Sequence, residues 1–513
     1  MPDTTDHNDP PPYELAPPLA GALIESLRGF GYSPATAIAD LVDNSISAGA
    51  NTVWLNFHFA GPESVITILD DGRGMSVDDL RRAMTLGGIG PLAPRQTSDL
   101  GRFGLGLKTA SFSQCRCLTV SSKRAGEAIA TRRWDLDYIA SPGVGDWRLL
   151  STPRPGSEAL LGALDSVGQG TLVVWEGLDR IVGSASAQNQ AAGDAFYDLA
   201  ARIEQHLAMV FHRYLEGQSP DLRILIGGHR IKPWDPFLRS NYATSATPVE
   251  SIGSVNGIVE LEGFVLPHKD QLGADYEQGG GPEGWTAQQG FYVYRNRRML
   301  VSGGWLGLGS PRVWTMEEPY KLARLRLEFP NSADHEWDID VKKSVARPPR
   351  WLRQRLMELA QAVRENARQV FAHRGTYGKR EAVPGLERAW TAHQIGGATS
   401  YRINREHPAV VRALEFPDRE TVAQALRIIE ETVPVQRIWL DTVENGEAPR
   451  EAFAEIADPQ IETLANSMLK HLTGKIGLDL ATAVARLRST DPFQNFPAIL
   501  DRLAGTPLTE EHS

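Results

Sequence analysis

Cysteine is nearly absent from this sequence of 513 residues, which contains only Cys115 and Cys117. A single Cys-x-Cys pair lacks the second ligand pair of a zinc site, so the sequence gives little support for a metal-bound cysteine centre. The stretch from Met1 to Pro18 is rich in proline and has no apolar core of an export signal. We expect residues 1–18 to be a flexible tail and the protein to be cytoplasmic.

Long hydrophobic runs are missing as well. An apolar run such as Gly170–Trp175 is far shorter than the ~20 residues that cross a bilayer, so we expect no membrane-spanning helix. Positive charge is not in excess, because the net charge is −10. Bulk charge therefore gives no support for DNA binding, although a local basic groove can still contact phosphates.

What the sequence does have is the composition of a globular protein, with 42% hydrophobic and 23% charged residues. At about 100–200 residues per domain, this length predicts roughly three domains. We expect an α/β domain over residues 19–215, a second α/β domain over 216–374 that ends in a long helix, and a mostly helical domain over 375–513.

Periodic patterns support this division. Strand-like segments are expected at Thr52–Phe57, Ser64–Leu69 and Leu222–Ile226. After the tolerated prolines Pro348 and Pro349, a long helix is indicated by apolar residues at helical spacing, namely Leu352, Leu356, Leu359, Val363 and Val370. Further helices are expected over 420–432 and 459–472.

The first motif with chemical meaning lies on an expected helix that begins after Ser33, a capping residue, with Pro34 in its first turn. Asp40 and Asn44 are four residues apart, so both side chains point to one face. A carboxylate there can deprotonate a water, and an amide oxygen can ligate Mg²⁺. Alone, this pattern equally fits a helix with solvated acids at one end.

The second motif, Asp70-Asp71-Gly72-Arg73-Gly74-Met75, directly follows an expected strand. Gly72 and Gly74 permit a sharp turn and a close approach of the backbone to a ligand. Asp70 at the strand end can accept a hydrogen bond from an exocyclic amine such as that of adenine. A common tight Asp-Gly turn is the alternative.

The third motif is a glycine-rich loop that leads into an expected helix from Leu107 to Phe112. Backbone N–H groups of such a loop can cradle phosphates, and a lysine can add positive charge. The candidate residues are Gly101, Arg102, Phe103, Gly104, Leu105, Gly106, Leu107 and Lys108. The spacing matches neither the Walker nor the Rossmann pattern. Residues 85–100 before it are expected to form a mobile lid.

A fourth element is Gly170-Thr171, which opens an apolar strand. Thr171 can support Asp70 through its hydroxyl or through a water, although strand threonines are usually structural.

The order of these four motifs resembles the GHKL superfamily, which includes gyrase, heat-shock chaperones, histidine kinases and MutL. The resemblance implies a Bergerat-type sandwich, in which helices pack on one face of a mixed, mostly antiparallel sheet. It also implies ATP and Mg²⁺ as ligands, with Asp40 as general base, Asn44 as metal ligand, Asp70 as adenine anchor and Gly101 to Lys108 as phosphate loop. Most ATP-hydrolysing relatives have glutamate at the position of Asp40, so the shorter side chain here predicts slow turnover.

Residues 216–374 indicate which members of the superfamily the chain resembles most. The stretch Phe291–Leu300 resembles a strand and turn of the transducer domain of MutL and MORC ATPases, a ribosomal S5-like α/β domain. The stretch Trp337–Ser344 resembles the transducer segment whose lysine reaches the γ-phosphate, and either Lys342 or Lys343 fits that role. A cation there would neutralise developing charge. A solvated lysine pair in a loop remains the alternative.

Three functions follow as hypotheses. The first is an ATP-gated dimeric clamp that acts with DNA in a bacterial defence or restriction-like system. The resemblance implies this setting, because bacterial relatives of this kind resemble components of restriction-like, anti-phage gene clusters. A basic cluster supports this hypothesis, although it fits a solvated face equally well, and it comprises Lys342, Lys343, Arg347, Arg350, Arg353 and Arg355. The second is a chaperone-like or signalling ATPase that acts on proteins, and the third is a nucleotide-binding regulator with little turnover. The C-terminal section matches no known family, and we interpret its His407 as structural or surface-exposed.

Overall fold

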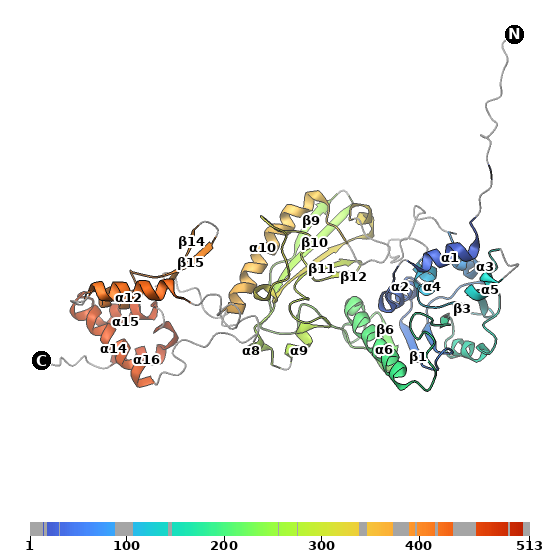
Figure 1. The fold of residues 1–513 in the computed structure, drawn as a ribbon, viewed down its shortest axis with the longest axis horizontal. Coiled ribbons are helices and arrows are strands. Elements are labelled where there is room, and N and C mark those ends of the chain that lie inside the picture. Colours follow the sequence, from blue (N-terminus) through green and yellow to red (C-terminus); the bar gives the residue numbers. More distant parts are fainter. Residues whose placement is uncertain are drawn as a thin grey trace, which may run out of the picture. The chain divides into compact units, whose positions relative to one another are not determined.

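A computed structural model describes residues 14, 18–29, 31–87, 106–141, 146–254, 256–273, 275–337, 346–372, 389–395, 398–415, 419–433, 458–490 and 493–505. The chain divides into two compact units, Met1–Phe371 and Ala372–Ser513. The first unit contains two β-sheets, and the second contains a β-hairpin and several helices (Figure 1). The predicted α/β fold with a mostly helical C-terminal part is confirmed.

The first sheet has seven strands in the order β4-β3-β5-β2-β1-β6-β7. Its strands are β1 (Thr52–His58), β2 (Val65–Asp70), β3 (Cys117–Lys123), β4 (Ala130–Asp135), β5 (Gly170–Glu176), β6 (Arg223–Ile226) and β7 (His229–Arg230). All neighbouring strands are antiparallel except β1 and β6, which are parallel. This is the mixed, mostly antiparallel sheet that the resemblance to the GHKL superfamily implies.

The strand β6 lies in the segment that we expected to open the second section, yet it pairs with β1. The first sheet therefore continues to Arg230, beyond the expected boundary at residue 215. Local alternation in the sequence shows that a strand forms but carries no information about the sheet that it joins.

Helices cover one face of the first sheet. They are α1 (Ala20–Arg28), α2 (Pro34–Ser47), α3 (Val77–Met84), α4 (Gly106–Phe112), α5 (Leu136–Ala140), α6 (Gln190–Val210) and α7 (His212–Leu215). The helix α2 packs against α4 and α6, and its Ile38 and Leu41 share one hydrophobic core with Leu55 and Ile66 of the sheet. On the other face, Leu164 of the 3₁₀ segment η1 (Glu158–Ser166) joins a smaller apolar cluster.

The second sheet has the strand order β12-β11-β13-β10-β8, with β9 also paired to β10. Its strands are β8 (Ser245–Ala246), β9 (Glu250–Ser254), β10 (Gly257–Val265), β11 (Gly290–Arg295), β12 (Arg298–Ser302) and β13 (Ala323–Phe329). Short helical segments connect them: α8 (Lys269–Leu272), α9 (Asp275–Gly280), η2 (Glu318–Tyr320) and η3 (Asn331–Glu336). The predicted strand and turn in Phe291–Leu300 is confirmed by the β11–β12 hairpin.

The long helix α10 (Arg350–Ala372) packs on this sheet (Figure 1). The predicted apolar positions Leu352, Leu356 and Val363 are buried. A Cβ on Gly263 of β10 would lie only 2.4 Å from the Val363 side chain, so glycine at this position permits the close approach. Among the described residues, no helix is long and apolar enough to span a bilayer.

The C-terminal unit contains the hairpin of β14 (Trp390–Ile395) and β15 (Ala398–Ile403). Its helices are α11 (Pro408–Ala413), α12 (Arg419–Glu431), α14 (Asp458–Gly474), α15 (Leu480–Arg488) and α16 (Pro497–Gly505), with the short η4 (Phe493–Asn495). The two predicted helices, over 420–432 and 459–472, are confirmed as α12 and α14. The hairpin was not predicted, because its strands lack an apolar alternation. The buried His407 caps α11 by accepting the Ala409 N–H at Nδ1, which confirms its structural interpretation.

Candidate nucleotide-binding site

The helix α2 positions two of the predicted site residues. Its first turn is capped as expected, because the Ser33 hydroxyl accepts the Thr36 N–H at 3.2 Å and Pro34 is the first helical residue. The Asp40 side chain is buried, whereas Asn44, one turn later, is exposed. The same helix therefore holds a carboxylate inside the fold and offers an amide at its surface.

Asp40 is oriented by Tyr32, whose hydroxyl donates to Oδ2 at 3.1 Å. Tyr32 is in turn held by Gln114, which donates to its backbone carbonyl at 3.0 Å. A Cβ on Gly106 would lie 3.6 Å from Asp40 Oδ2, so the end of the third motif reaches the candidate general base. Sequence reasoning missed Tyr32 and Gln114. The tyrosine lies eight residues before Asp40 and outside its helix, so helical spacing cannot reveal the contact.

Asp70 occupies the last position of β2 and is 7% exposed. Its Oδ1 accepts the N–H groups of Gly72 at 2.9 Å and Thr171 at 3.3 Å, and its Oδ2 accepts the Ser45 hydroxyl at 2.9 Å. Burial raises the pKa of Asp70 to about 6, against the lowering effect of these hydrogen bonds. The predicted adenine anchor is thus a desolvated carboxylate held in a fixed orientation.

Ser45 connects the two parts of the site, and sequence reasoning missed it. The residue directly follows Asn44 on α2 and bonds Asp70 on β2. A single serine next to a motif has no sequence pattern that would mark it as a site residue. Only the packing of α2 against the sheet brings this hydroxyl to the carboxylate.

Thr171 supports Asp70 through its backbone N–H, not through the predicted hydroxyl. The Thr171 hydroxyl instead lies 2.9 Å from the hydroxyl of Ser122, which also accepts the Met75 N–H at 2.8 Å. Ser122 thereby ties β3, β5 and the turn after Asp70 together. It is a second serine that the sequence did not single out.

The glycines of the second and fourth motifs are required by contacts within the protein. A Cβ on Gly72 would lie 2.8 Å from the Ala48 side chain, and one on Gly74, at φ +65°, would lie 2.0 Å from the Lys123 carbonyl oxygen. A Cβ on Gly170 would lie 2.0 Å from the Asp70 carbonyl oxygen. These glycines let the turn pack on α2 and β3 and let β5 approach Asp70.

Lys108 is buried on α4 and contacts the end of α3. Its Nζ donates to the carbonyl oxygens of Ala83 at 2.7 Å and Thr85 at 3.0 Å. Burial lowers the pKa of Lys108 to about 8. A cation at the end of a helix interacts favourably with its last carbonyls, so Lys108 fixes the point where the expected lid begins.

Several candidates lie outside the described residues. They are Gly101, Arg102, Phe103, Gly104 and Leu105 of the third motif, together with Lys342 and Lys343. The residues that flank the lysine pair are described. Trp337 stacks on Phe329 with ring centroids 4.3 Å apart, and its carbonyl accepts the Arg347 N–H at 2.8 Å.

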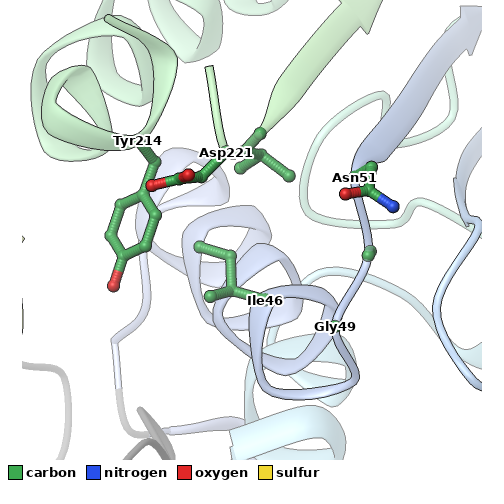
Figure 2. A pocket seen from close by; sticks show the side chains of 7 residues that line it. Ile46, Gly49, Asn51, Tyr214 and Asp221 are labelled. Atoms are coloured by element: carbon green, nitrogen blue, oxygen red, sulfur yellow. The ribbon is translucent and has the colours of Figure 1, made fainter. Parts of the chain in front are cut away.

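A surface pocket of about 280 Å³ lies at the C-terminal end of α2 (Figure 2). It is lined by Ile46, Gly49, Ala50, Asn51, Tyr214, Asp221 and Leu222. None of these is a predicted site residue. Because the hydrogen-bonded carboxylates and the glycine turn lie elsewhere on α2 and β2, we place the candidate site at Asp40, Asn44 and Asp70 and not in this pocket.

Comparison with known proteins finds similarity over this part of the chain. Residues 32–171 match the family model of the histidine kinase-, DNA gyrase B- and HSP90-like ATPases. Over 93 residues the chain is 33% identical to ATPase morc-1 of Caenorhabditis elegans, covering 18% of this chain and 10% of that protein. Over 122 residues it is 27% identical to the DNA mismatch repair protein MutL of Wolbachia sp. subsp. Brugia malayi (strain TRS), covering 24% and 19%.

A shorter segment of 50 residues is 42% identical to MutL of Parabacteroides distasonis, covering 10% of this chain and 8% of that protein. The chain thus matches under one fifth of the length of each of these relatives. The matched family segment contains Tyr32, Asp40, Asn44, Asp70 and Thr171. By its nucleotide-site motifs and its α/β fold, this chain is similar to the GHKL ATPases, and among them it resembles MutL and MORC proteins.

Proposed function

We propose that the protein binds ATP with Mg²⁺ at Asp40, Asn44 and Asp70 and hydrolyses it. The fixed, buried carboxylate of Asp70 carries this proposal. Three of its about four lone-pair sites accept hydrogen bonds within the protein, and the remaining site on Oδ2 can accept the exocyclic amine of adenine. The bond from Ser45 to Asp70 joins this anchor to the helix that carries Asp40 and Asn44.

The described residues fit this ligand. The exposed Asn44 offers the oxygen that Mg²⁺ prefers, and a single protein oxygen suffices for a metal that keeps phosphates and waters as its other ligands. A bound Mg²⁺ supplies charge neutralisation at the phosphates. Asp40, oriented by Tyr32, accepts the proton of the attacking water. Lys342 or Lys343 stays a proposal for the cation at the γ-phosphate, as do Gly101 to Lys108 for the phosphate loop.

Nucleotide competition tests the adenine anchor. Asp70 accepts a hydrogen bond from the amine of adenine, whereas guanine has a carbonyl oxygen at that position. We expect ATP to bind about 5- to 150-fold more tightly than GTP, because a mismatched buried acceptor costs about 1–3 kcal/mol. Asp70→Asn should remove most of this preference.

Asp71→Asn is the matched control for that experiment. Asp71 belongs to the same turn, but its Oδ1 accepts the N–H groups of Asn51 at 2.7 Å and Thr52 at 2.8 Å. The asparagine keeps one oxygen for these two N–H groups, so Asp71→Asn should leave the turn and the nucleotide preference intact. Equal affinity of the wild-type protein for ATP and GTP would contradict the assignment of Asp70.

We further propose that ATP drives homodimerisation and that the dimer acts with DNA in a bacterial defence or restriction-like system. The resemblance to MutL and MORC proteins and the transducer-like β11–β12 hairpin support this clamp hypothesis. DNA-stimulated ATP turnover that falls steeply between 50 and 200 mM salt is the expected result. Turnover that ignores DNA at every salt concentration would contradict it.

Ion pairs within the basic cluster favour a second candidate function, an ATPase that acts on a protein client. Within the basic cluster, Arg355 forms a bidentate ion pair with Glu250, at 2.7 Å, and also contacts Glu358. Arg353 donates to the Gly307 carbonyl. These contacts and the net charge of −10 reduce the positive potential available to phosphates. Turnover stimulated by an unfolded protein client, but not by DNA, would favour the chaperone-like function.

A further inference from the structure

The β11–β12 hairpin of the second sheet ends in a tight turn that contacts the first section. Asn296 and Arg297 form the turn with φ of +47° and +67°, the left-handed conformation of a two-residue hairpin loop. The Asn296 carbonyl accepts the Tyr214 hydroxyl at 2.6 Å, and Arg297 pairs with Asp221 at 2.5 Å. The turn therefore docks on α7 and on the segment before β6.

The next residue, Arg298, reaches α2 itself. Its Nε lies 3.2 Å from Oδ1 of Asp43, and the two side chains are 4% and 0% exposed. Nη1 of Arg298 donates to the Met299 carbonyl at 2.7 Å, and the guanidinium lies 5.8 Å from the centre of the Phe211 ring. A buried ion pair of this kind is costly to break from one side, because the remaining charge stays desolvated.

Asp43 lies on α2 between the two candidate site residues of that helix. It lies three residues after Asp40 and directly before Asn44, so its side chain neighbours that of Asp40 on the helix surface. The candidate general base and the candidate metal ligand are thus on the same helical turn as the residue that Arg298 holds. A shift or rotation of α2 at Asp43 moves both groups.

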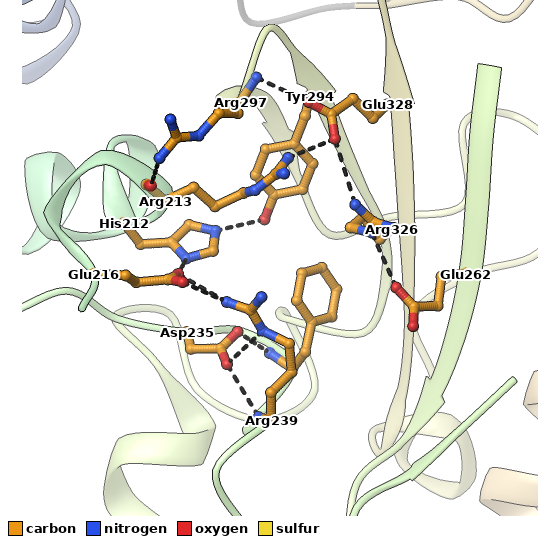
Figure 3. Close-up of polar contacts among 11 residues, drawn as sticks. His212, Arg213, Glu216, Asp235, Arg239, Glu262, Tyr294, Arg297, Arg326 and Glu328 are labelled. Atoms are coloured by element: carbon orange, nitrogen blue, oxygen red, sulfur yellow. Dashed lines mark hydrogen bonds and ion pairs between the residues drawn. The ribbon is translucent and has the colours of Figure 1, made fainter. Parts of the chain in front are cut away.

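Further polar contacts join α7 to β11 and β13 (Figure 3). His212 of α7 bonds the Tyr294 hydroxyl of β11 through Nε2 at 2.8 Å, and Arg213 pairs with Glu328 of β13 at 2.6 Å. Burial lowers the pKa of His212 and raises that of Tyr294 well above its usual value, so this contact joins two neutral groups at pH 7. The hairpin is therefore fixed on α7 while its last arginine holds α2.

We propose that Arg298 is a positioning residue for the nucleotide site, which it sets through Asp43 and α2. The proposal rests on ATP binding and hydrolysis at Asp40, Asn44 and Asp70. Because energetic coupling between two sites is reciprocal, nucleotide bound at α2 also changes the freedom of the β11–β12 hairpin. The mobility of the hairpin in the second sheet thereby depends on whether nucleotide is bound at α2.

A matched control lies in the same hairpin. Arg295 is 1% exposed and pairs with Asp334 at 2.7 Å, but Asp334 belongs to η3 of the second section. Arg295→Met and Arg298→Met each remove one buried guanidinium from the same hairpin. Of the two guanidinium groups, only that of Arg298 is seen to contact α2, through Asp43.

The test measures ATP turnover, nucleotide affinity and hydrogen exchange of residues 290–302 in the full chain. Arg298→Met should lower kcat about tenfold, because α2 positions Asp40, and should weaken binding of a non-hydrolysable ATP analogue about fivefold or more, since binding and hairpin protection are coupled reciprocally. ADP affinity measured without Mg²⁺ should change less than threefold, because Asp70 keeps its bonds from the Gly72 and Thr171 N–H groups. A non-hydrolysable ATP analogue should slow exchange of 290–302 in the wild type and in Arg295→Met, but not in Arg298→Met. Arg295→Met should lower Tm similarly and leave kcat unchanged.

If Arg298→Met does not fold, Arg298→Lys replaces it, with a smaller loss of kcat in the same direction, since one ammonium group cannot make both contacts of Arg298. Unchanged kcat and exchange protection in these variants would overturn the positioning role, as would an equal loss of kcat in Arg295→Met. A wild-type protein that binds ADP but shows no nucleotide-dependent exchange refutes the coupling alone. A wild-type protein without nucleotide affinity refutes the proposed function and the coupling together.

Discussion

The first section and the C-terminal unit bury different kinds of groups. Around α2 and β2 the interior holds the carboxylates of Asp40, Asp43 and Asp70. The core of the C-terminal helices is apolar, with Leu469, Ala483 and Leu500 among its members. The described residues of that unit do include one carboxylate with a buried side chain, Glu430, but it pairs with Arg402 and Arg405 outside this apolar core. Burying a charge costs free energy, whereas burying an apolar side chain is favourable. The carboxylates around α2 and β2 therefore lower the stability of the first section at the place where we expect its chemistry.

The largest expected effect concerns the general base. Asp40→Asn keeps the size of the side chain and removes its basicity, so ATP turnover should fall by about 10²–10⁴-fold. ATP affinity should change little, because Asp70 and Asn44 are retained. Steady-state turnover and equilibrium binding of the purified variant check this. Turnover equal to that of the wild type would instead favour a nucleotide-binding regulator with no catalytic role for Asp40.

A core change in the C-terminal unit should act on stability alone. Leu469 is fully buried, so Leu469→Ala should lower the free energy of unfolding of that unit by about 2–5 kcal/mol. Denaturant unfolding followed by circular dichroism measures the loss. ATP turnover per folded molecule should remain that of the wild type, and a parallel loss of turnover would break the contrast between the two regions.

Asp70→Asn should raise the stability of the nucleotide-free protein, whereas Leu469→Ala lowers it. Burial raises the pKa of Asp70 from 3.8 to about 6, a cost of up to about 3 kcal/mol to the ionised protein at 1.36 kcal/mol per pH unit. An asparagine keeps an oxygen for the Gly72 and Thr171 N–H groups. Without nucleotide, the variant should therefore unfold at a higher temperature than the wild type at pH 8. A lower Tm would show that Asp70 is a structural carboxylate.

The smallest expected effect is a pH dependence of opposite direction for two quantities. As pH rises, the stability of the nucleotide-free fold falls and the affinity for ATP rises. Since the folded pKa of Asp70 lies above the unfolded value, this group makes the nucleotide-free fold less stable as pH rises from about 4 to 6. Ionised Asp70 is the better acceptor for adenine, so ATP affinity should fall about tenfold between pH 7 and 5. Calorimetric titrations at several pH values measure it. Asp70→Asn should lack this part of the pH dependence.

Local signals in the sequence predicted the individual elements of the site well. The Ser33 cap and Pro34 fix the start of α2, and Asp70 ends β2 as expected. Gly170 opens β5, where a close approach to the Asp70 carbonyl requires glycine. Each of these depends on residues within one turn or one strand, which short-range patterns describe.

Contacts between distant segments could not be predicted in this way. Ser45 and Ser122 reach the site only after α2 and β3 pack around Asp70. The pairing of β6 with β1 and the ion pair of Arg298 with Asp43, 255 residues apart, likewise arise from tertiary packing. These contacts hold the site in place, whereas the motifs supply its chemistry.

Calorimetric titration of the purified full chain with ATP, in the presence of Mg²⁺ and then of EDTA, tests the central claim most directly. We predict saturable binding of one ATP per chain with Mg²⁺ and affinity at least ~10-fold weaker in EDTA, since Asn44 and the phosphates share the metal. No detectable binding of ATP under either condition would contradict the account.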